Sequence, residues 1–283
     1  MDTETISADR EMANVAVAVA ADGVITITEN TSFVGVLDAY QPVACYSVAR
    51  RLRTAYEGPL VRVRRDDNAE EDIYFLADGS LDSSRLSEFA EFTDCWIRTR
   101  YDQSGNARHC IQTDTAKQNR LAIQGSLVTK NSRPSSLGFA SDAAEIYTGS
   151  TIMQHVFAVA AFQLGAFSEL NGIITGLSTP NGIVLIANGN STTVLYDSHP
   201  AIIRLNGTAT NAFAPITTLK VAECQLTTAT QMDGVVLTQD RQVTSTRGWT
   251  GWMPEAIVFA TSLSTTQATA LRNNLYSYYG ITP

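Results

Sequence analysis

The feature that most constrains the fold is a succession of short β-type segments that begins at residue 120. Val, Ile and Thr gather in runs, and several runs are separated by turn formers such as Asn206-Gly207 and Asp233-Gly234. Many short strands at regular spacing are typical of a β-sandwich. The segments are RLAIQ, SSLGF, TIMQHVFAVAAF, GIITGL, GIVLIANG, TTVLYD, AIIRLNG, TTLKVAECQL, GVVLTQD and EAIVFAT.

The rest of the chain predicts a few helices and an N-terminal arm. Three- and four-residue apolar spacing predicts helices over 42–55 and 84–96, and a final helix that begins after Ser264 and ends at Gly280. PLVRVRR reads as a strand, DDNAEED as a turn and IYFL as a strand, while NVAVAVAADGVITIT reads as a β-hairpin. We therefore expect an arm over 1–34 for docking or oligomerisation and one sandwich domain over 35–283.

Charge and apolar patterning exclude some partners. The net charge of −8 disfavours nucleic acid, because an acidic surface repels phosphates. The longest apolar runs fall short of the roughly 20 residues of a membrane span. The acidic start MDTETISADREM predicts no secretory signal, and we expect the four separated cysteines to be reduced thiols.

Two stretches of the chain resemble a known family. CYSVARRLRTAYEGPLVRVRRDDNAEEDIYF followed by IRTRYDQSGN is similar to the N-terminal part of the catalytic domain of α-L-arabinofuranosidase B, and also resembles concanavalin A-like domains of tailed-phage structural proteins. GWMPEAIVFATSLSTTQATALRNNLYSYYGI is similar to the closing strand and helix of such lectin-like sandwiches. The resemblance, over about 36–125 and 249–281, implies a mainly β, concanavalin A-like jelly-roll sandwich.

Catalysis of glycoside hydrolysis would need two carboxylates across one sugar. Only Glu223, in KVAECQL, and Glu255, before AIVFA, sit among apolar residues, and a carboxylate in a strand more often pairs with Arg. We therefore assign no catalytic residue. The candidates in the sheet-forming half are Asp142, Glu145, Glu169, Asp197, Glu223, Asp233, Asp240 and Glu255.

The polar motifs fit structural turns better than they fit a metal site or a Ser-His-Asp catalytic triad. DDNAEED lacks the glycine of an EF-hand loop, and adjacent His109-Cys110 does not have zinc-finger spacing. YDQSGN crowds Asp102 and Ser104 into one short turn, where both can accept backbone N–H groups. We expect no metal, no cofactor and a structural turn.

Sugar binding is the remaining use of these motifs. TRGWTGWMP places Trp249 and Trp252 three residues apart, so in an extended segment one ring faces the core and the other faces outward. An exposed ring with amide or carboxylate partners from the YDQSGN loop would bind a sugar. The candidate carbohydrate-binding residues are Trp249, Trp252, Asp102 and Asn106.

The expected function follows from the phage side of the resemblance. The arabinofuranosidase family, as the resemblance implies, consists of secreted enzymes with several disulfides, one of them between adjacent cysteines, and this chain has no adjacent cysteines. We therefore expect a non-enzymatic structural protein of a tailed-phage virion (a head decoration, fibre, tail or receptor-binding protein), made in the host cytoplasm. The arm would join other virion proteins and build a homo-oligomer, expected to be a trimer, and host or environmental glycans are possible ligands. The alternatives are an α-L-arabinofuranosidase-type glycoside hydrolase and a carbohydrate-binding module.

Overall fold

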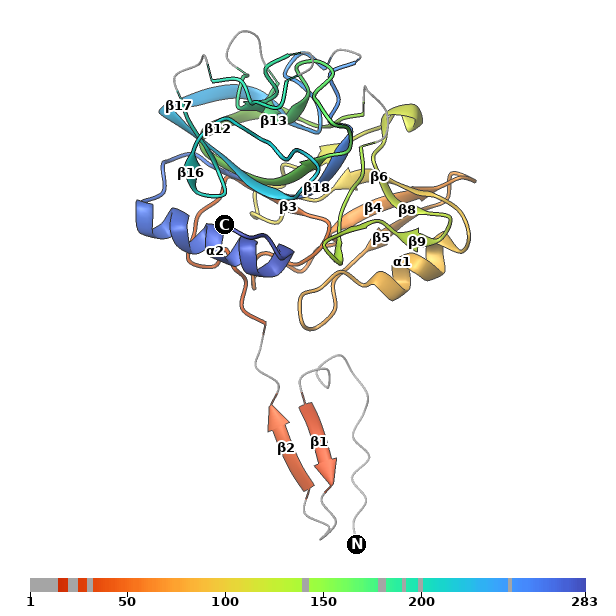
Figure 1. Ribbon diagram of the computed structural model, residues 1–283. Coiled ribbons are helices and arrows are strands. Elements are labelled where there is room, and N and C mark those ends of the chain that lie inside the picture. The colour runs from red at the N-terminus through yellow and green to blue at the C-terminus, as the bar shows by residue number, and fades with distance from the viewer. Residues whose placement is uncertain are drawn as a thin grey trace, which may run out of the picture.

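The computed structural model shows an antiparallel β protein with two α-helices (Figure 1). It describes residues 15–19, 25–29, 33–138, 143–177, 182–189, 192–197, 201–243 and 246–283.

The N-terminal hairpin predicted from the sequence is confirmed. Strand β1 (Val15–Val19) pairs antiparallel with β2 (Ile25–Glu29), and Val17 lies opposite Ile27. The turn over 20–24 lies outside the described residues. The docking role of the arm stays a prediction.

Two long strands organise the main domain. Strand β12 (Glu145–Phe162) runs antiparallel to β17 (Lys220–Leu237), with shifts of register near Thr148 and Met153. Each long strand changes its outer neighbour along its length. The first half of β17 pairs with β15 (Ala201–Leu205), and its second half pairs with β13 (Gly172–Gly176).

The long strands therefore contribute to both layers of a sandwich. The second half of β12 pairs with β18 (Gly251–Phe259), which pairs with β3 (Ala44–Ser47). Alternate side chains of these strands meet residues of β13 and of β14 (Leu185–Ile186) in one buried cluster that includes Phe162, Phe167 and Trp249. The expectation of a mainly β sandwich is confirmed.

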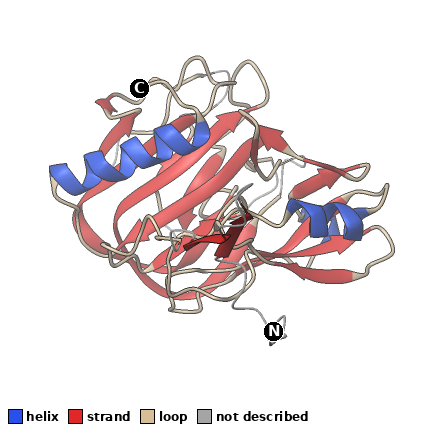
Figure 2. Ribbon diagram, turned by 90° about the horizontal axis from the view of Figure 1, so that it is seen from below, coloured by secondary structure: helices blue, strands red, loops and turns tan. Residues whose placement is uncertain are grey.

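The longer helix covers the other face of the β12–β17–β18 layer (Figure 2). Helix α2 (Thr265–Tyr279) begins at Ser264 in a capping box with Gln267 and ends at Gly280, whose φ of 58° is left-handed. Its buried residues, among them Leu271 and Leu275, pack on the outward face of the sheet. This helix is the one predicted from the sequence.

A smaller region extends the sheet. Helix α1 (Ser83–Ala90) buries Leu86 and Ala90 in a third apolar cluster together with residues of the neighbouring strands. The short strand β7 connects this region to the main domain, because it pairs with both β6 and β12. The strands of this region and its connection to the main domain are β4 (Val61–Arg65), β5 (Glu70–Ile73), β6 (Cys95–Arg100), β7 (Cys110–Ile111), β8 (Arg120–Ile123) and β9 (Ser126–Leu127), with a 3₁₀ turn at Thr115–Lys117. Strands β10 (Thr129–Lys130) and β11 (Arg133–Pro134) form a separate hairpin, and β16 (Thr208–Ala209) pairs with β15 in the main domain.

The turn predicted over DDNAEED and the strand predicted over IYFL are misplaced, because the strand is Glu70–Ile73, and the helix predicted over 84–96 ends at Ala90. Two further local predictions are wrong. The segment 42–55 is not a helix, because all four side chains of β3 are buried and its backbone pairs with β18, more than 200 positions away. Asp233-Gly234 does not form a turn, because both residues lie inside β17, where Gly234 faces Thr148. In both places pairing with a distant strand overrides the local preference.

Neither helix of the described chain is long and apolar enough to cross a membrane.

Candidate functional site

Acid–base chemistry would have to come from carboxylates that a substrate can reach. Five carboxylate side chains of the described residues are buried in the domain, and the partners of each decide whether it is free to act. They are Asp102, Glu145, Glu223, Asp240 and Glu255.

Glu223 is held by three cationic or proton-donating side chains. Its oxygens lie 2.8 Å from His155 Nε2, 2.9 Å from Arg204 Nη1 and 2.6 Å from Arg272 Nη1. Because His155 Nδ1 accepts the Leu263 N–H, Nε2 carries the proton that faces Glu223. Burial raises the pKa of Glu223, but His155 and Arg272 outweigh burial and the pKa ends below its usual value. Glu223 is therefore an ionised anchor beneath α2.

Glu255 is equally occupied. Arg50 binds it in a bidentate pair at 2.9 and 3.0 Å, and the Tyr279 hydroxyl donates to it at 2.8 Å. The pair joins β18, α2 and the segment after β3. Both acids singled out from the sequence are thus buried, as their apolar neighbours indicated, but both are fixed in ion pairs on the face that α2 covers.

Glu145 forms the most deeply buried ion pair. Both its side chain and that of Arg100 are 0% exposed, with N–O distances of 2.6 and 2.9 Å. Arg100 also donates to the Met253 carbonyl and to Ser136 Oγ, and Asn119 donates to Glu145. All these groups are closed off from solvent, so the network fixes strands and offers no reactive group.

Asp240 differs because it lies in the loop after β17. Its Oδ2 accepts from Arg247 Nη1 at 2.8 Å, and its Oδ1 accepts from the Gln242 N–H. Arg247 is 27% exposed and also donates to Gln242. Asp240 and Asp102 both lie in loops, but Asp102 is occupied by three backbone N–H groups, whereas Asp240 faces the partly exposed Arg247 and is the better placed of the two to meet a substrate.

A neighbouring loop closes this end of the sandwich. The Gly172 N–H donates to the Arg247 carbonyl, and Asn171 Nδ2 donates to the Gly248 carbonyl. Asn171 Oδ1 accepts the N–H groups of Ser168 and Glu169. Glu169, partly exposed, therefore lies on a loop that is hydrogen-bonded to the Asp240 loop. Asp142, another carboxylate considered from the sequence, lies outside the described residues.

The YDQSGN segment is a structural turn, as predicted. Asp102 accepts the N–H groups of Cys45, Ser104 and Arg108, and Ser104 Oγ accepts the Asn106 N–H. Gly105 has a φ of 93°, in the left-handed region that glycine tolerates. The turn fastens the loop after β6 to the start of β3.

The four candidate carbohydrate-binding residues do not meet at one place. Trp249 is fully buried, and its Nε1–H donates to the Ala161 carbonyl, so its ring offers no face to a sugar. Trp252 is half-buried, with Lys130 Nζ 4.0 Å from its ring centroid. Asp102 and Asn106 lie beside Val43, which bonds to Val258, six residues further along β18 than Trp252. Six strand residues span about 20 Å. A binding role for Trp252 or Asn106 stays a prediction.

Metal binding has no obvious place in the described part of the chain, where no three His, Cys, Asp or Glu side chains are grouped as ligands. The four cysteines are buried, and none of them forms a disulfide. Burial raises the pKa of Cys95 to about 12, so this thiol stays protonated and unreactive at neutral pH.

Comparison with known proteins places this architecture in a family. The family model for the catalytic domain of α-L-arabinofuranosidase B matches residues 39–194, more than half of the chain. The chain belongs to this family. The match includes strand β3, the YDQSGN turn and β12, the first of the two long strands.

Individual relatives agree with the family match. A probable α-L-arabinofuranosidase B of Aspergillus fumigatus is 39% identical over 72 residues, which are 25% of this chain and 14% of that protein. An α-L-arabinofuranosidase of Hypocrea jecorina is 39% identical over 71 residues, with the same coverage. The matched stretch is thus about a seventh of the length of these curated relatives.

Solved structures share the fold. A glutamate-to-glutamine mutant of a GH54 α-L-arabinofuranosidase, soaked with 4-nitrophenyl α-L-arabinofuranoside, superposes with a TM-score of 0.56 at 17% identity, over 83% of this chain and 62% of that one. An arabinofuranosidase complexed with arabinofuranosyl-α-1,2-xylobiose has a TM-score of 0.53 at 16% identity, over the same shares of the two chains.

The family membership corrects the function expected from the sequence. The expectation of a non-enzymatic virion protein is wrong, and so is a location in a phage particle, because the family model and the matched relatives are arabinofuranosidases, the two relatives above from Aspergillus and Hypocrea. The chain matches the family model although it has no adjacent cysteines. Oligomeric state and partners stay predictions.

Proposed function

We propose that this chain is a glycoside hydrolase that releases arabinose from α-L-arabinofuranosides. The observation that carries the proposal is the match of the arabinofuranosidase B catalytic model to residues 39–194. The shared fold with arabinofuranosidase structures over 83% of the chain supports it.

The reaction requires one carboxyl group to protonate the leaving oxygen and a second to act as nucleophile or base. Asp240 is our candidate for one of these groups, because it is a buried loop carboxylate that faces the partly exposed Arg247. Glu169 is a candidate for the other, because its loop is hydrogen-bonded through Asn171 to the Asp240 loop. Glu223 and Glu255 have structural roles in this proposal, since arginines occupy both.

The test is hydrolysis of 4-nitrophenyl α-L-arabinofuranoside by the full chain, measured through the nitrophenolate that is released. 4-Nitrophenyl β-D-xylopyranoside serves as a second substrate, because one relative, from Trichoderma koningii, is described as an arabinofuranosidase and β-xylosidase. We expect turnover of the arabinofuranoside well above the rate in buffer. No turnover of either substrate by a folded chain would refute the proposal.

Two variants test the assignment of residues. Asp240→Asn should lower kcat at least 100-fold, the scale of lost acid–base catalysis. The matched control is Asp197→Asn, a carboxylate-to-amide change at an exposed aspartate whose described contact is Asn211. Circular dichroism and thermal unfolding must show that each variant is folded. Equal activity of Asp240→Asn and wild type would remove Asp240 from the mechanism.

A further inference from the structure

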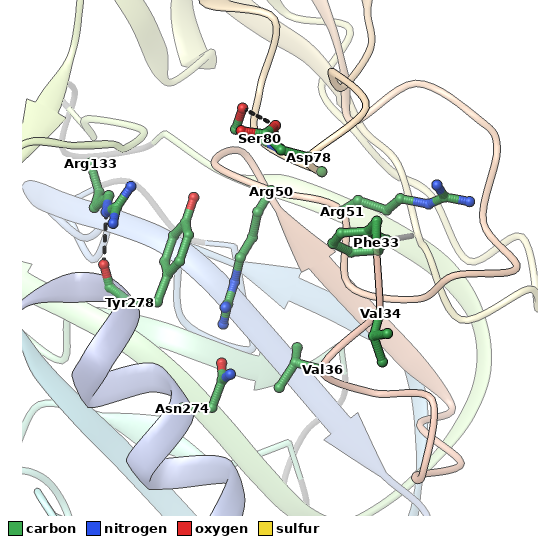
Figure 3. Close-up of a pocket in the computed structure, with 11 residues that line it drawn as sticks. Phe33, Val34, Val36, Arg50, Arg51, Asp78, Ser80, Arg133, Asn274 and Tyr278 are labelled. Atoms are coloured by element: carbon green, nitrogen blue, oxygen red, sulfur yellow. Dashed lines mark hydrogen bonds between the residues drawn. The ribbon is translucent and has the colours of Figure 1, made fainter. Parts of the chain in front are cut away.

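A separate pocket lies beside the C-terminal half of α2. It has a volume of about 350 Å³ and lies between the segment after the arm, the loop between β5 and α1 and the β10–β11 hairpin. Figure 3 shows Arg133, Tyr278 and Arg50 side by side, with Asn274 on one side of them and Asp78 and Ser80 on the other. The polar lining residues are Arg50, Arg51, Asp78, Ser80, Arg133, Asn274 and Tyr278.

The guanidinium groups give the pocket a surplus of positive charge. Arg50 is neutralised by Glu255, but no carboxylate among the described residues forms a salt bridge with Arg51 or Arg133. Arg133 uses one donor, Nε, on the Tyr278 carbonyl at 2.8 Å. Planar guanidinium donors without a carboxylate partner are suited to bind a ligand's anionic group in two-point fashion.

Stacking holds these cations in place. The Cζ atoms of Arg50 and Arg133 lie 4.0 and 4.4 Å from the Tyr278 ring centroid. Arg51 lies 4.5 Å from Phe75 and 5.2 Å from Phe33. Cation–π contacts of this kind restrict the long side chains, so less entropy is lost when a ligand binds.

The pocket also presents acceptors, which a bare anion would not satisfy. Asn274 Oδ1 is buried and has no hydrogen-bond partner among the described residues. The carboxylate of Asp78 accepts from Ser80, and the Ser80 hydroxyl supports a lower pKa of Asp78, so it is ionised at neutral pH. A phosphate or sulfate offers few donors and is repelled by Asp78, whereas a hydroxylated ligand can donate to both acceptors.

An apolar wall completes the pocket. Phe33, Val34 and Val36 line it, and Val34 is 76% exposed. Phe33 packs so closely on Gly79 that an added Cβ there would lie 2.2 Å from the ring. An aromatic wall beside hydrogen-bonding groups suits the C–H face of a sugar ring.

We infer that this pocket binds a carboxylate-bearing sugar, such as a hexuronate residue of the polysaccharide on which the enzyme acts. Arg133 binds the carboxylate, Asn274 and Asp78 accept from ring hydroxyls, and Phe33 contacts the ring. The polysaccharide origin of the ligand rests on the proposed function, whereas binding of the free sugar does not.

Isothermal titration calorimetry of the full chain tests the inference without turnover. D-glucuronate and D-galacturonate are the ligands, with D-glucose, D-galactose, acetate and inorganic phosphate as controls. We expect one hexuronate to bind at a single site at least tenfold more tightly than any control. Equal binding of a neutral hexose, or of acetate or phosphate, would overturn the inference, and so would absence of hexuronate binding.

Matched variants locate the site. Arg133→Met and Asn274→Asp should each weaken hexuronate binding at least tenfold, and Arg133→Lys should weaken it less than Arg133→Met. The control is Arg85→Met, which removes an exposed guanidinium on α1. Equal effects of Arg133→Met and Arg85→Met would show that only net charge matters and would contradict the site.

One further arm separates this pocket from the catalytic proposal. The pocket borders α2, whereas the Asp240 loop bonds to the loop before β13. Saturating hexuronate should therefore leave the KM of wild-type enzyme for 4-nitrophenyl α-L-arabinofuranoside unchanged. Competitive inhibition would place the hexuronate at the catalytic centre and overturn the inference, while leaving the proposed function intact.

Discussion

Trp249 provides the sharpest test of how the sandwich core is built. Its ring lies 4.9 Å from Phe162, 5.5 Å from Phe167 and 5.7 Å from Phe213, measured between centroids, and it is fully buried. A buried tryptophan removes roughly 200 Å² from water, about 5 kcal/mol at 25 cal/mol per Å² as an upper estimate. Trp249→Ala should therefore lower the free energy of unfolding by about 3–5 kcal/mol.

The assay is urea unfolding followed by far-UV circular dichroism, which does not depend on tryptophan fluorescence. Trp252→Ala is the matched control, because this ring is half-buried at the edge of the cluster beneath α2, with Lys130 over its face. It should cost about 1–2 kcal/mol. The reasoning is refuted if Trp249→Ala costs less than about 1.5 kcal/mol with an unchanged m-value, or if the two variants are equally destabilised.

Three further perturbations test other parts of the domain. Arg100→Met should lower the free energy of unfolding by about 3–5 kcal/mol, because it leaves the Glu145 charge buried without its arginine. The double variant Arg100→Met/Glu145→Met should regain at least half of that loss in the same urea titration. A loss below about 1 kcal/mol for the single variant would contradict the role of the pair. The folded-state pKa of Glu223 is lowered, so its contribution to stability is present above its ordinary pKa near 4.5 and is lost as pH falls through the folded value. Glu223→Gln should therefore lose less stability than wild type between pH 5 and 3. Parallel curves of stability against pH for the two proteins would disprove this. Gly280→Ala should lower stability by about 1 kcal/mol through its left-handed φ of 58° alone, since nothing lies within 4 Å of the added Cβ. The control Ser277→Ala, at an exposed helix position, should change stability little in thermal unfolding. Equal effects of the two variants would argue against strain at the helix end.

Local signals in the sequence predicted those parts of the fold that local interactions determine. The final helix was predictable because Ser264, Gln267 and Gly280 are capping residues at the right spacing. The YDQSGN turn was predictable because Asp102 and Ser104 bond to backbone groups within four residues in addition to their long-range contacts.

Long-range pairing explains what the sequence did not reveal. Apolar spacing over 42–55 imitates a helix, and only the register with β18 shows that Ala44–Ser47 is a strand. Trp96 has the residue type and strand position of a core residue, but it is half-buried, with Arg64 of the neighbouring strand β4 at 4.6 Å from its ring centroid.

The candidate sites show the same limit. Apolar neighbours correctly indicated that Glu223 and Glu255 are buried, but their arginine partners are 19 to 205 positions away and leave no local trace. Asp240 had one local signal, its position directly after the apolar run GVVLTQ, which is typical of a strand end. The pocket beside α2 had none, because its lining comes from separate segments between Phe33 and Tyr278.

The pairing of the central strands also determines when the domain can form during synthesis. The family match ends at residue 194, yet the partners of β12 along most of its length, β17 and β18, begin at Lys220 and Gly251. A nascent chain that ends at residue 194 therefore carries a central strand with most of its edges open, an aggregation-prone state. Folding of the core must wait until residues up to Phe259 at the end of β18 have left the ribosome, so a high contact order and slow folding follow from the topology.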